Sequence, residues 1–156
     1  MNKSAIAIYG QAGRGKSATI RELANQLMNA FPNHTLQTIN DGGDITYIIE
    51  INGVRIGIES QGDPNSRQPR SLADFVAANC DIIICACRTS GMTRDAVADL
   101  HRNHQYEIIW IANHRSWQKN QDQLNLISAI EILELIKLIM NGDEKMLNTF
   151  IQEFRE

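Results

Sequence analysis

A short run of glycines followed by a lysine and a serine is the part of this sequence best suited to chemistry. It has the pattern G-x-x-x-x-G-K-S and comprises Gly10, Gln11, Ala12, Gly13, Arg14, Gly15, Lys16 and Ser17. Glycines let the backbone approach a phosphate closely, because no side chain intervenes and positive φ angles are accessible. A lysine at this spacing can reach the β- and γ-phosphates of a nucleotide, and the serine hydroxyl can bind Mg²⁺. The run therefore predicts a phosphate-binding loop.

The segments on either side of this loop are those that a phosphate-binding loop needs. An apolar strand is predicted over residues 4–9, and apolar residues at helical spacing follow the loop, beginning with Ile20 and Leu23. The N-terminus of such a helix presents free N–H groups and a positive dipole end to an anion. In this setting the loop resembles the Walker A motif of the P-loop NTPase superfamily. The resemblance implies that ATP or GTP binds with Mg²⁺, and that residues Gly10 to Ala18 contact the phosphates.

A second candidate element follows the strand predicted over residues 54–58. The letters E-S-Q-G, beginning at Glu59, resemble the D-x-x-G element of small GTPases, and the order of loop, helix and hairpin is similar too. The resemblance implies that Glu59 binds Mg²⁺ directly or through water, and that the N–H of Gly62 senses the γ-phosphate. In that family a glutamine one place beyond the glycine orients the attacking water. This chain has Asp63 there, so Gln61, Asp63 and Glu59 are all candidates for that role.

The base-reading segment of small GTPases has a partial counterpart in this chain. The family motif N-K-x-D follows a late strand, and the corresponding letters here are N-H-R-S, beginning at Asn113. Asn113 is therefore a candidate nucleotide contact, but the aspartate that accepts hydrogen bonds from the guanine amino group is missing. The segment favours ATP over GTP, and a GTPase-like switch is an alternative.

The glycine-rich pattern also resembles that of small-molecule and nucleotide kinases. Those enzymes usually insert acceptor-binding helices between early strands and add an arginine-rich lid. The hairpin predicted over residues 45–58, joined by Asn52-Gly53, leaves no room for such an insert. Arg88, Arg94 and Arg102 could still form a partial arginine set. A phosphotransferase is therefore the second interpretation of the motif.

Strand and helix patterns alternate along the chain. Strands are predicted at 4–9, 35–39, 45–51, 54–58, 81–87 and 106–112, and helices from the loop to about residue 30 and at 71–79, 93–103, 122–140 and 143–154. The alternation predicts a three-layer α/β/α sandwich with a mostly parallel sheet and one early antiparallel hairpin, the P-loop NTPase fold. Residues 60–70 read as a long exposed loop, and Trp110 as part of a buried strand. Ligands of such sheets bind at the carboxyl ends of the strands, where four of the predicted loops converge.

The composition is that of a globular protein. The 156 residues are 43% hydrophobic and 21% charged, with a formal net charge of −3, which suits one domain spanning residues 1–156. The small negative charge does not indicate a nucleic-acid-binding surface. No stretch reaches the roughly 18 apolar residues of a membrane span, and no secretory leader is recognisable. A cytoplasmic location without membrane contact is expected.

The apolar segment 124–140 leaves only a narrow polar stripe on its predicted helix. Burial under the helix predicted over residues 143–154 is one explanation, and an interface with a partner or a second copy is the other. Together these features predict a Mg²⁺-dependent nucleotide-binding protein, an ATP hydrolase acting as a switch or stimulated by a partner. The alternatives are a kinase and a nucleotide-binding module without catalytic activity.

Overall fold

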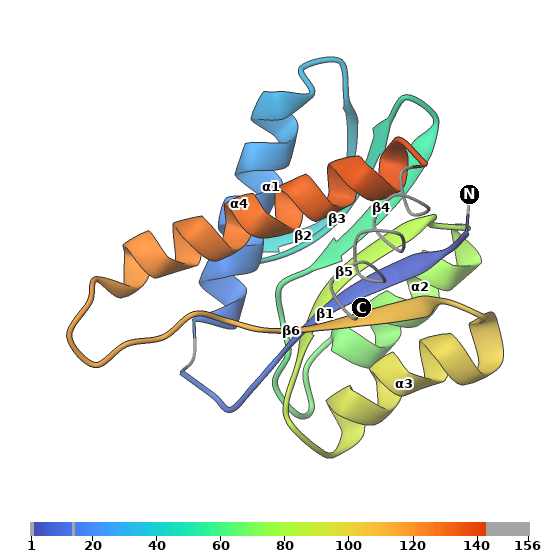
Figure 1. Cartoon of the computed structure of the whole chain (residues 1–156). Coiled ribbons are helices and arrows are strands. Elements are labelled where there is room, and N and C mark those ends of the chain that lie inside the picture. The colour runs from blue at the N-terminus through green and yellow to red at the C-terminus, as the bar shows by residue number, and fades with distance from the viewer. Residues whose placement is uncertain (1, 14, 143–156) are drawn as a thin grey trace, which may run out of the picture.

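The computed structural model describes residues 2–13 and 15–142. Strands and helices alternate along this part of the chain (Figure 1). The strands are β1 (Ser4–Tyr9), β2 (Thr35–Gly42), β3 (Asp44–Ile51), β4 (Val54–Glu59), β5 (Ile82–Cys87) and β6 (Glu107–Ala112). The helices are α1 (Lys16–Ala30), α2 (Gln68–Ala77), α3 (Met92–His104) and α4 (Gln121–Met140). The α/β class predicted from the sequence is confirmed.

The described strands form one six-stranded sheet in the order β2-β3-β4-β5-β1-β6. β3 is antiparallel to both of its neighbours, whereas the pairings β4–β5, β5–β1 and β1–β6 are parallel. Every described strand except β3 therefore points the same way, and the sheet is mostly parallel, as predicted. Because β3 runs in the opposite direction, its first residue, Asp44, lies at the edge of the sheet where the other strands end.

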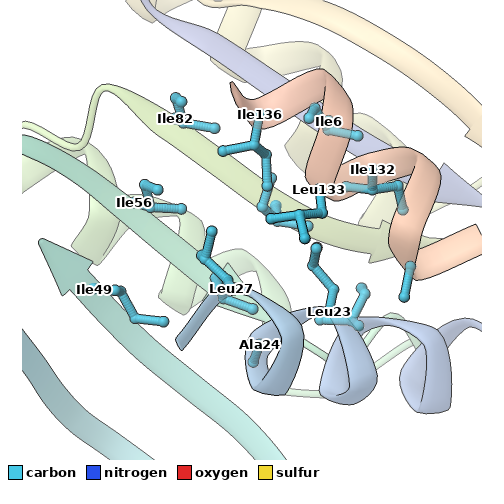
Figure 2. Close-up of a cluster of buried hydrophobic side chains, with 14 of the residues drawn as sticks. Ile6, Leu23, Ala24, Leu27, Ile49, Ile56, Ile82, Ile132, Leu133 and Ile136 are labelled. Carbon is cyan, nitrogen blue, oxygen red and sulfur yellow. The ribbon is translucent and has the colours of Figure 1, made fainter. Parts of the chain in front are cut away.

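One face of the sheet is covered by α1 and α4. Apolar residues recur on one side of each helix, and Figure 2 shows Leu23 and Leu27 of α1 beside Leu133 of α4. The two helices pack over strand residues that include Ile6 and Ile56, all of them fully buried. Burying a Leu or Ile side chain contributes about 1.5–3 kcal/mol to folding. This apolar layer fixes the position of α1, whose first turn follows the predicted phosphate-binding loop.

The opposite face is covered by α2 and α3, which complete the three layers. Leu72 and Phe75 of α2 pack with Val97 of α3 in a second buried cluster. Phe75 lies directly over Gly57 of β4, where an added Cβ would be 2.5 Å from the ring. A glycine is required at this position because the ring occupies the space of a side chain.

Two element boundaries differ by three residues from those predicted, and the other differences are smaller. β2 extends beyond residue 39 to Gly42, with an irregularity between Thr38 and Asn40, because its polar end still pairs with β3. α2 begins at Gln68, ahead of the predicted start at Ser71, with a proline in its first turn. Proline suits that position because its missing N–H would have no partner there. The segment predicted as a wholly exposed loop, 60–70, therefore contributes its last residues to a helix.

The interpretation of Trp110 as a core residue is wrong. β6 pairs only with β1 among the described strands and forms an edge of the sheet (Figure 1). Trp110 is 36% exposed, and its ring carries the Arg94 guanidinium at 3.8 Å. The apolar run of β6 predicted a buried strand, but every residue of β6 is exposed or only partly buried.

α4 is both a core helix and a source of exposed apolar surface. Ile132, Leu133 and Ile136 are buried in the same cluster as Leu23 of α1 and Ile6 of β1, whereas burial under the segment 143–154 stays a prediction. On the other side Ile127 and Ile130 are 48% and 43% exposed. An interface between copies or with a partner stays a prediction. The helix predicted over residues 143–154 lies outside the described residues.

Candidate functional site

The loops after β1, β4, β5 and β6, together with the start of β3, lie at one edge of the sheet. We call this the site edge. The direction of the strands places these segments there, because all described strands except β3 end at this edge. Figure 1 shows the loop after β1 leading directly into α1. The convergence of loops predicted from the sequence is therefore confirmed for the described residues.

The loop between β1 and α1 has the backbone conformation that its glycines predict. Gly13 and Gly15 have φ angles of 75° and 77°, values that side-chain-bearing residues rarely adopt. α1 begins at Lys16, and no side chain of a described residue caps its N-terminus. Its first N–H groups point toward the loop, as an anion site requires. Arg14, a predicted contact residue, lies outside the described residues.

Gly15 is also confined by the loop after β6. A Cβ added there would lie 2.6 Å from Asn125 Oδ1 and 3.0 Å from Asn113 Nδ2. Asn113 donates to Asn125 Oδ1 at 2.9 Å and accepts from Thr19 Oγ1 at 2.8 Å. The amide of Asn113 thus joins the end of β6 to α1 and α4. The structure brings Asn113 to the glycine-rich loop through side chains that sequence reasoning did not single out, and its contact with a nucleotide stays a prediction.

Lys16 is buried, and its side chain folds back over the loop. Its Nζ donates to Gly10 O and to Gln11 O, both at 2.7 Å. Only 6% of the residue is exposed. The ammonium charge is therefore held at the loop rather than in solvent. Ala12 and Gln11 are exposed on the same loop, and Ala18 lies in the first turn of α1.

Ser17 connects α1 to the loop after β4. Its hydroxyl donates to Ser60 O at 2.7 Å. Ser60 is fully buried, and its own hydroxyl donates to Asp44 Oδ1 at 2.8 Å while accepting from Ile45 N. A chain of hydrogen bonds therefore runs from the first turn of α1 to the first residue of β3. No local pattern of residues predicts this chain of hydrogen bonds, although the predicted hairpin implies that Asp44 shares an edge with Ser60.

Glu59 is completely buried and its carboxylate is engaged by the protein. Oε1 accepts from Thr46 Oγ1 at 2.7 Å and from the Ser71 hydroxyl. Oε2 accepts from Gln61 N at 3.0 Å. These bonds hold β3, β4 and α2 together at the site edge, and they satisfy a charge that would otherwise be costly to bury. The sequence interpretation did not connect Thr46 or Ser71 with Glu59.

Gln61, Gly62 and Asp63 lie in the loop that follows, but their side chains point to different partners. Gln61 Oε1 accepts from Arg67 N at 3.0 Å, which forms the turn before α2. Asp63 pairs with Arg88 at 3.0 Å, and the Asp63 side chain is 70% exposed. Gly62 packs on β5, where an added Cβ would lie 2.7 Å from the Cβ of Ala86. The loop is therefore attached to the end of β5.

The three arginines considered for a kinase-like set do not gather at the site edge. Arg88 is engaged by Asp63, and Arg94 stacks on Trp110 and lies 5.8 Å from the Tyr9 ring. Arg102 lies in the last turn of α3, at the opposite end of that helix from Arg94. The partial arginine set is therefore not formed in this arrangement.

Positive charge nevertheless reaches the end of β5. Burial raises the pKa of the Cys87 thiol to about 11, and the charges of Arg94 and Lys16 both oppose that shift. Arg115 adds a further cation, because its Nη1 donates to Gly13 O. Trp117, next to it, is 95% exposed. The site edge is thus electropositive around the loop, which favours an anionic ligand.

Comparison of the chain with protein-family models, curated proteins and solved structures found no match. None of the helices in residues 2–13 and 15–142 has the length and apolar character that a membrane span requires. Within the same residues, no three His, Cys, Asp or Glu side chains gather into a metal-binding cluster. The geometry of the site edge is therefore the basis for assigning a function.

Proposed function

We propose that this protein binds a nucleoside triphosphate at the loop between β1 and α1 and hydrolyses it with Mg²⁺. The observation that carries the proposal is the backbone of that loop. Gly13 and Gly15 adopt left-handed φ angles, and α1 starts immediately afterwards without a side-chain cap from the described residues. Such a loop directs N–H groups at one anion, and the positive end of the helix dipole adds to the attraction.

The buried lysine supports the same assignment. Lys16 keeps its ammonium within 2.7 Å of two loop carbonyls, so the charge is held where phosphate oxygens would be received. A lysine that served only stability would gain more in solvent, because burying an ammonium group is costly. In the proposed reaction Lys16 stabilises the negative charge that develops on the γ-phosphate when water attacks in line and ADP leaves.

The residues at the start of α1 also fit a magnesium ion. Mg²⁺ takes oxygen ligands, retains several waters and is usually bound through one or two protein groups together with substrate phosphates. The Ser17 hydroxyl lies at the correct position of the motif and makes a bond to Ser60 O that it can exchange. When bound, Mg²⁺ would neutralise charge on the β- and γ-phosphates.

The residue that orients the attacking water is one of three candidates. Asp63 is exposed and could move with its loop, whereas Gln61 is bound to Arg67 N and Glu59 is buried with both oxygens engaged. The loop that carries them contacts Ser17 through Ser60. A change at the phosphate site would therefore be transmitted to residues 60–67, which favours a switch function. ATP is the preferred nucleotide because the aspartate of the guanine-reading motif is missing.

Nucleotide binding and turnover test this proposal directly. Binding of fluorescent ATP and GTP analogues and release of phosphate would be measured with Mg²⁺ for the wild type, for Lys16→Ala and for the matched control Lys137→Ala. Lys137 lies on α4 and pairs with Glu134. Hydrogen bonds to a charged group contribute about 1.5–3 kcal/mol, so Lys16→Ala should weaken binding by about tenfold to a hundredfold. The proposal is wrong if the wild type binds neither nucleotide, or if both variants bind alike.

A further inference from the structure

The turn between β2 and β3 places a second acidic residue at the site edge. Asp44 is the first residue of β3, and β3 runs antiparallel to β4. It follows that Asp44 lies beside the end of β4, two residues beyond the register pair formed by Thr46 and Glu59. The position depends on strand pairing, since residue 44 is far from the phosphate-binding loop in the sequence.

The contacts of Asp44 lead to the residue proposed to bind the metal. Its Oδ1 accepts from Ser60 Oγ at 2.8 Å, and Ser60 O accepts from Ser17 Oγ at 2.7 Å. Ser60 is therefore the one residue that links the Asp44 carboxylate to the Ser17 hydroxyl. The Asp44 side chain is 33% exposed, so water can reach it.

The carboxylate of Glu59 is less suited to the same task. It is fully buried, and its two oxygens accept hydrogen bonds from Thr46, Ser71 and the Gln61 N–H. A metal-bound water would have to displace one of these partners from the interior. The Asp44 carboxylate accepts on Oδ1 from Ser60 and, at a long 3.5 Å, from Arg21, while the backbone oxygen of Asp44 accepts from Asn40 Nδ2.

We propose that Asp44 is the acidic residue that positions the nucleotide-bound Mg²⁺, by accepting hydrogen bonds from its water ligands beside Ser17. This inference rests on the proposed function, because the metal arrives with the nucleotide. Residues that orient metal ligands from the outer shell matter strongly, and their loss typically lowers metal affinity by about 10- to 100-fold.

A purely structural role for Asp44 is the competing explanation. The pair with Arg21 joins two side chains that are 42% and 33% exposed. Exposed pairs of this kind contribute little to stability. If the pair were the function of Asp44, removing either partner would have the same effect, and that equivalence can be tested.

The same turn offers a matched control. Asp41 is exposed and lies three positions earlier, but it faces a different partner. Burial and a hydrogen bond to Asp41 raise the pKa of Tyr47. Asp41→Asn therefore removes the same charge from the same turn without touching Ser60 or Ser17.

The test measures how much Mg²⁺ strengthens binding of a fluorescent, non-hydrolysable ATP analogue. Affinity would be determined with Mg²⁺ and with EDTA for the wild type, Asp44→Asn, Asp41→Asn and Arg21→Gln. We expect Asp44→Asn to lose about 10- to 100-fold of the Mg²⁺-dependent affinity while its affinity in EDTA is unchanged. Asp41→Asn should match the wild type, and Arg21→Gln should match it or bind Mg²⁺ more tightly.

A measurement on the wild type covers the case in which Asp44→Asn fails to fold. With Mn²⁺ in place of Mg²⁺, the paramagnetic ion should broaden the amide signal of Ile45 and leave that of Ile51, at the other end of β3, sharp. Equal broadening of both signals, or of neither, contradicts the inference.

The outcomes separate this inference from the proposed function. A wild type that binds no nucleotide overturns both. A wild type that binds with Mg²⁺, together with an Asp44→Asn variant that keeps the full Mg²⁺ effect, overturns the role of Asp44 alone. Equal losses in Asp44→Asn and Arg21→Gln would identify the ion pair as structural and would also overturn it.

Discussion

Replacing Gly62 with alanine should detach the loop after β4 from β5. A Cβ on Gly62 would lie 2.7 Å from the Cβ of Ala86, 2.8 Å from its carbonyl carbon and 3.0 Å from its carbonyl oxygen. Two of these atoms belong to the backbone of a central strand, so a side-chain rotation cannot relieve the clash. The loop has to move instead.

The expected loss of stability follows from the steric conflict alone. Gly62 does not have a positive φ angle, so alanine adds no backbone strain there. Forcing one extra carbon into a packed site costs about 1–3 kcal/mol. Gly42→Ala is the matched control. A Cβ added at Gly42 would have Asn40 Oδ1, at 3.7 Å, as its nearest neighbour, and the φ angle of Gly42 is not in the positive region either. That variant should lie within about 0.5 kcal/mol of the wild type.

Urea denaturation followed by circular dichroism measures both free energies of unfolding. Hydrogen exchange then locates the effect, and we expect faster exchange at Ser60 and Gln61 in Gly62→Ala. If Gly62→Ala is as stable as Gly42→Ala, the loop does not pack on β5 as described and the reasoning fails.

Two further predictions concern burial and stacking. Burial raises the pKa of Cys80 to about 12 and that of Cys87 to about 11, both from 9.0. The native thiols keep their protons at pH values where the unfolded ones ionise, so their contribution to stability should be constant below about pH 8 and fall between pH 9 and 11; denaturation midpoints that rise between pH 9 and 11 would contradict this. Arg94→Ala should lose the contact over Trp110, worth about 0.5–1 kcal/mol, and change the tryptophan fluorescence, whereas Arg102→Ala should not.

Much of the fold could be predicted because the signals are local. The glycine-rich loop, the start of α1 and the hairpin at Asn52-Gly53 each follow from a few adjacent residues, and the positive φ angles of 51° and 80° in that hairpin agree with the expected turn chemistry. The alternation of strands and helices then predicted the layers.

The remaining features depend on strand order, which no local pattern specifies. β1 lies between β5 and β6, so β6 is an edge strand and Trp110 is partly exposed. In the same way, Glu59 is buried because Thr46 and Ser71 reach it from a neighbouring strand and a helix. The convergence of the loops was therefore predictable, while the hydrogen bonds that connect Ser17, Ser60 and Asp44 required the structure, and the binding role of the loop and of Asn113 stays a prediction.

The central claim is that the loop between β1 and α1 binds a nucleoside triphosphate. Titration of the ¹⁵N-labelled protein with ATP and Mg²⁺ tests it most directly, because each amide reports separately. We predict saturable shifts that are largest at Gly13, Gly15 and Ser17 and small at Leu100 on the far face. Absence of saturable shifts at the three loop and helix amides, or larger shifts at Leu100, would contradict the account.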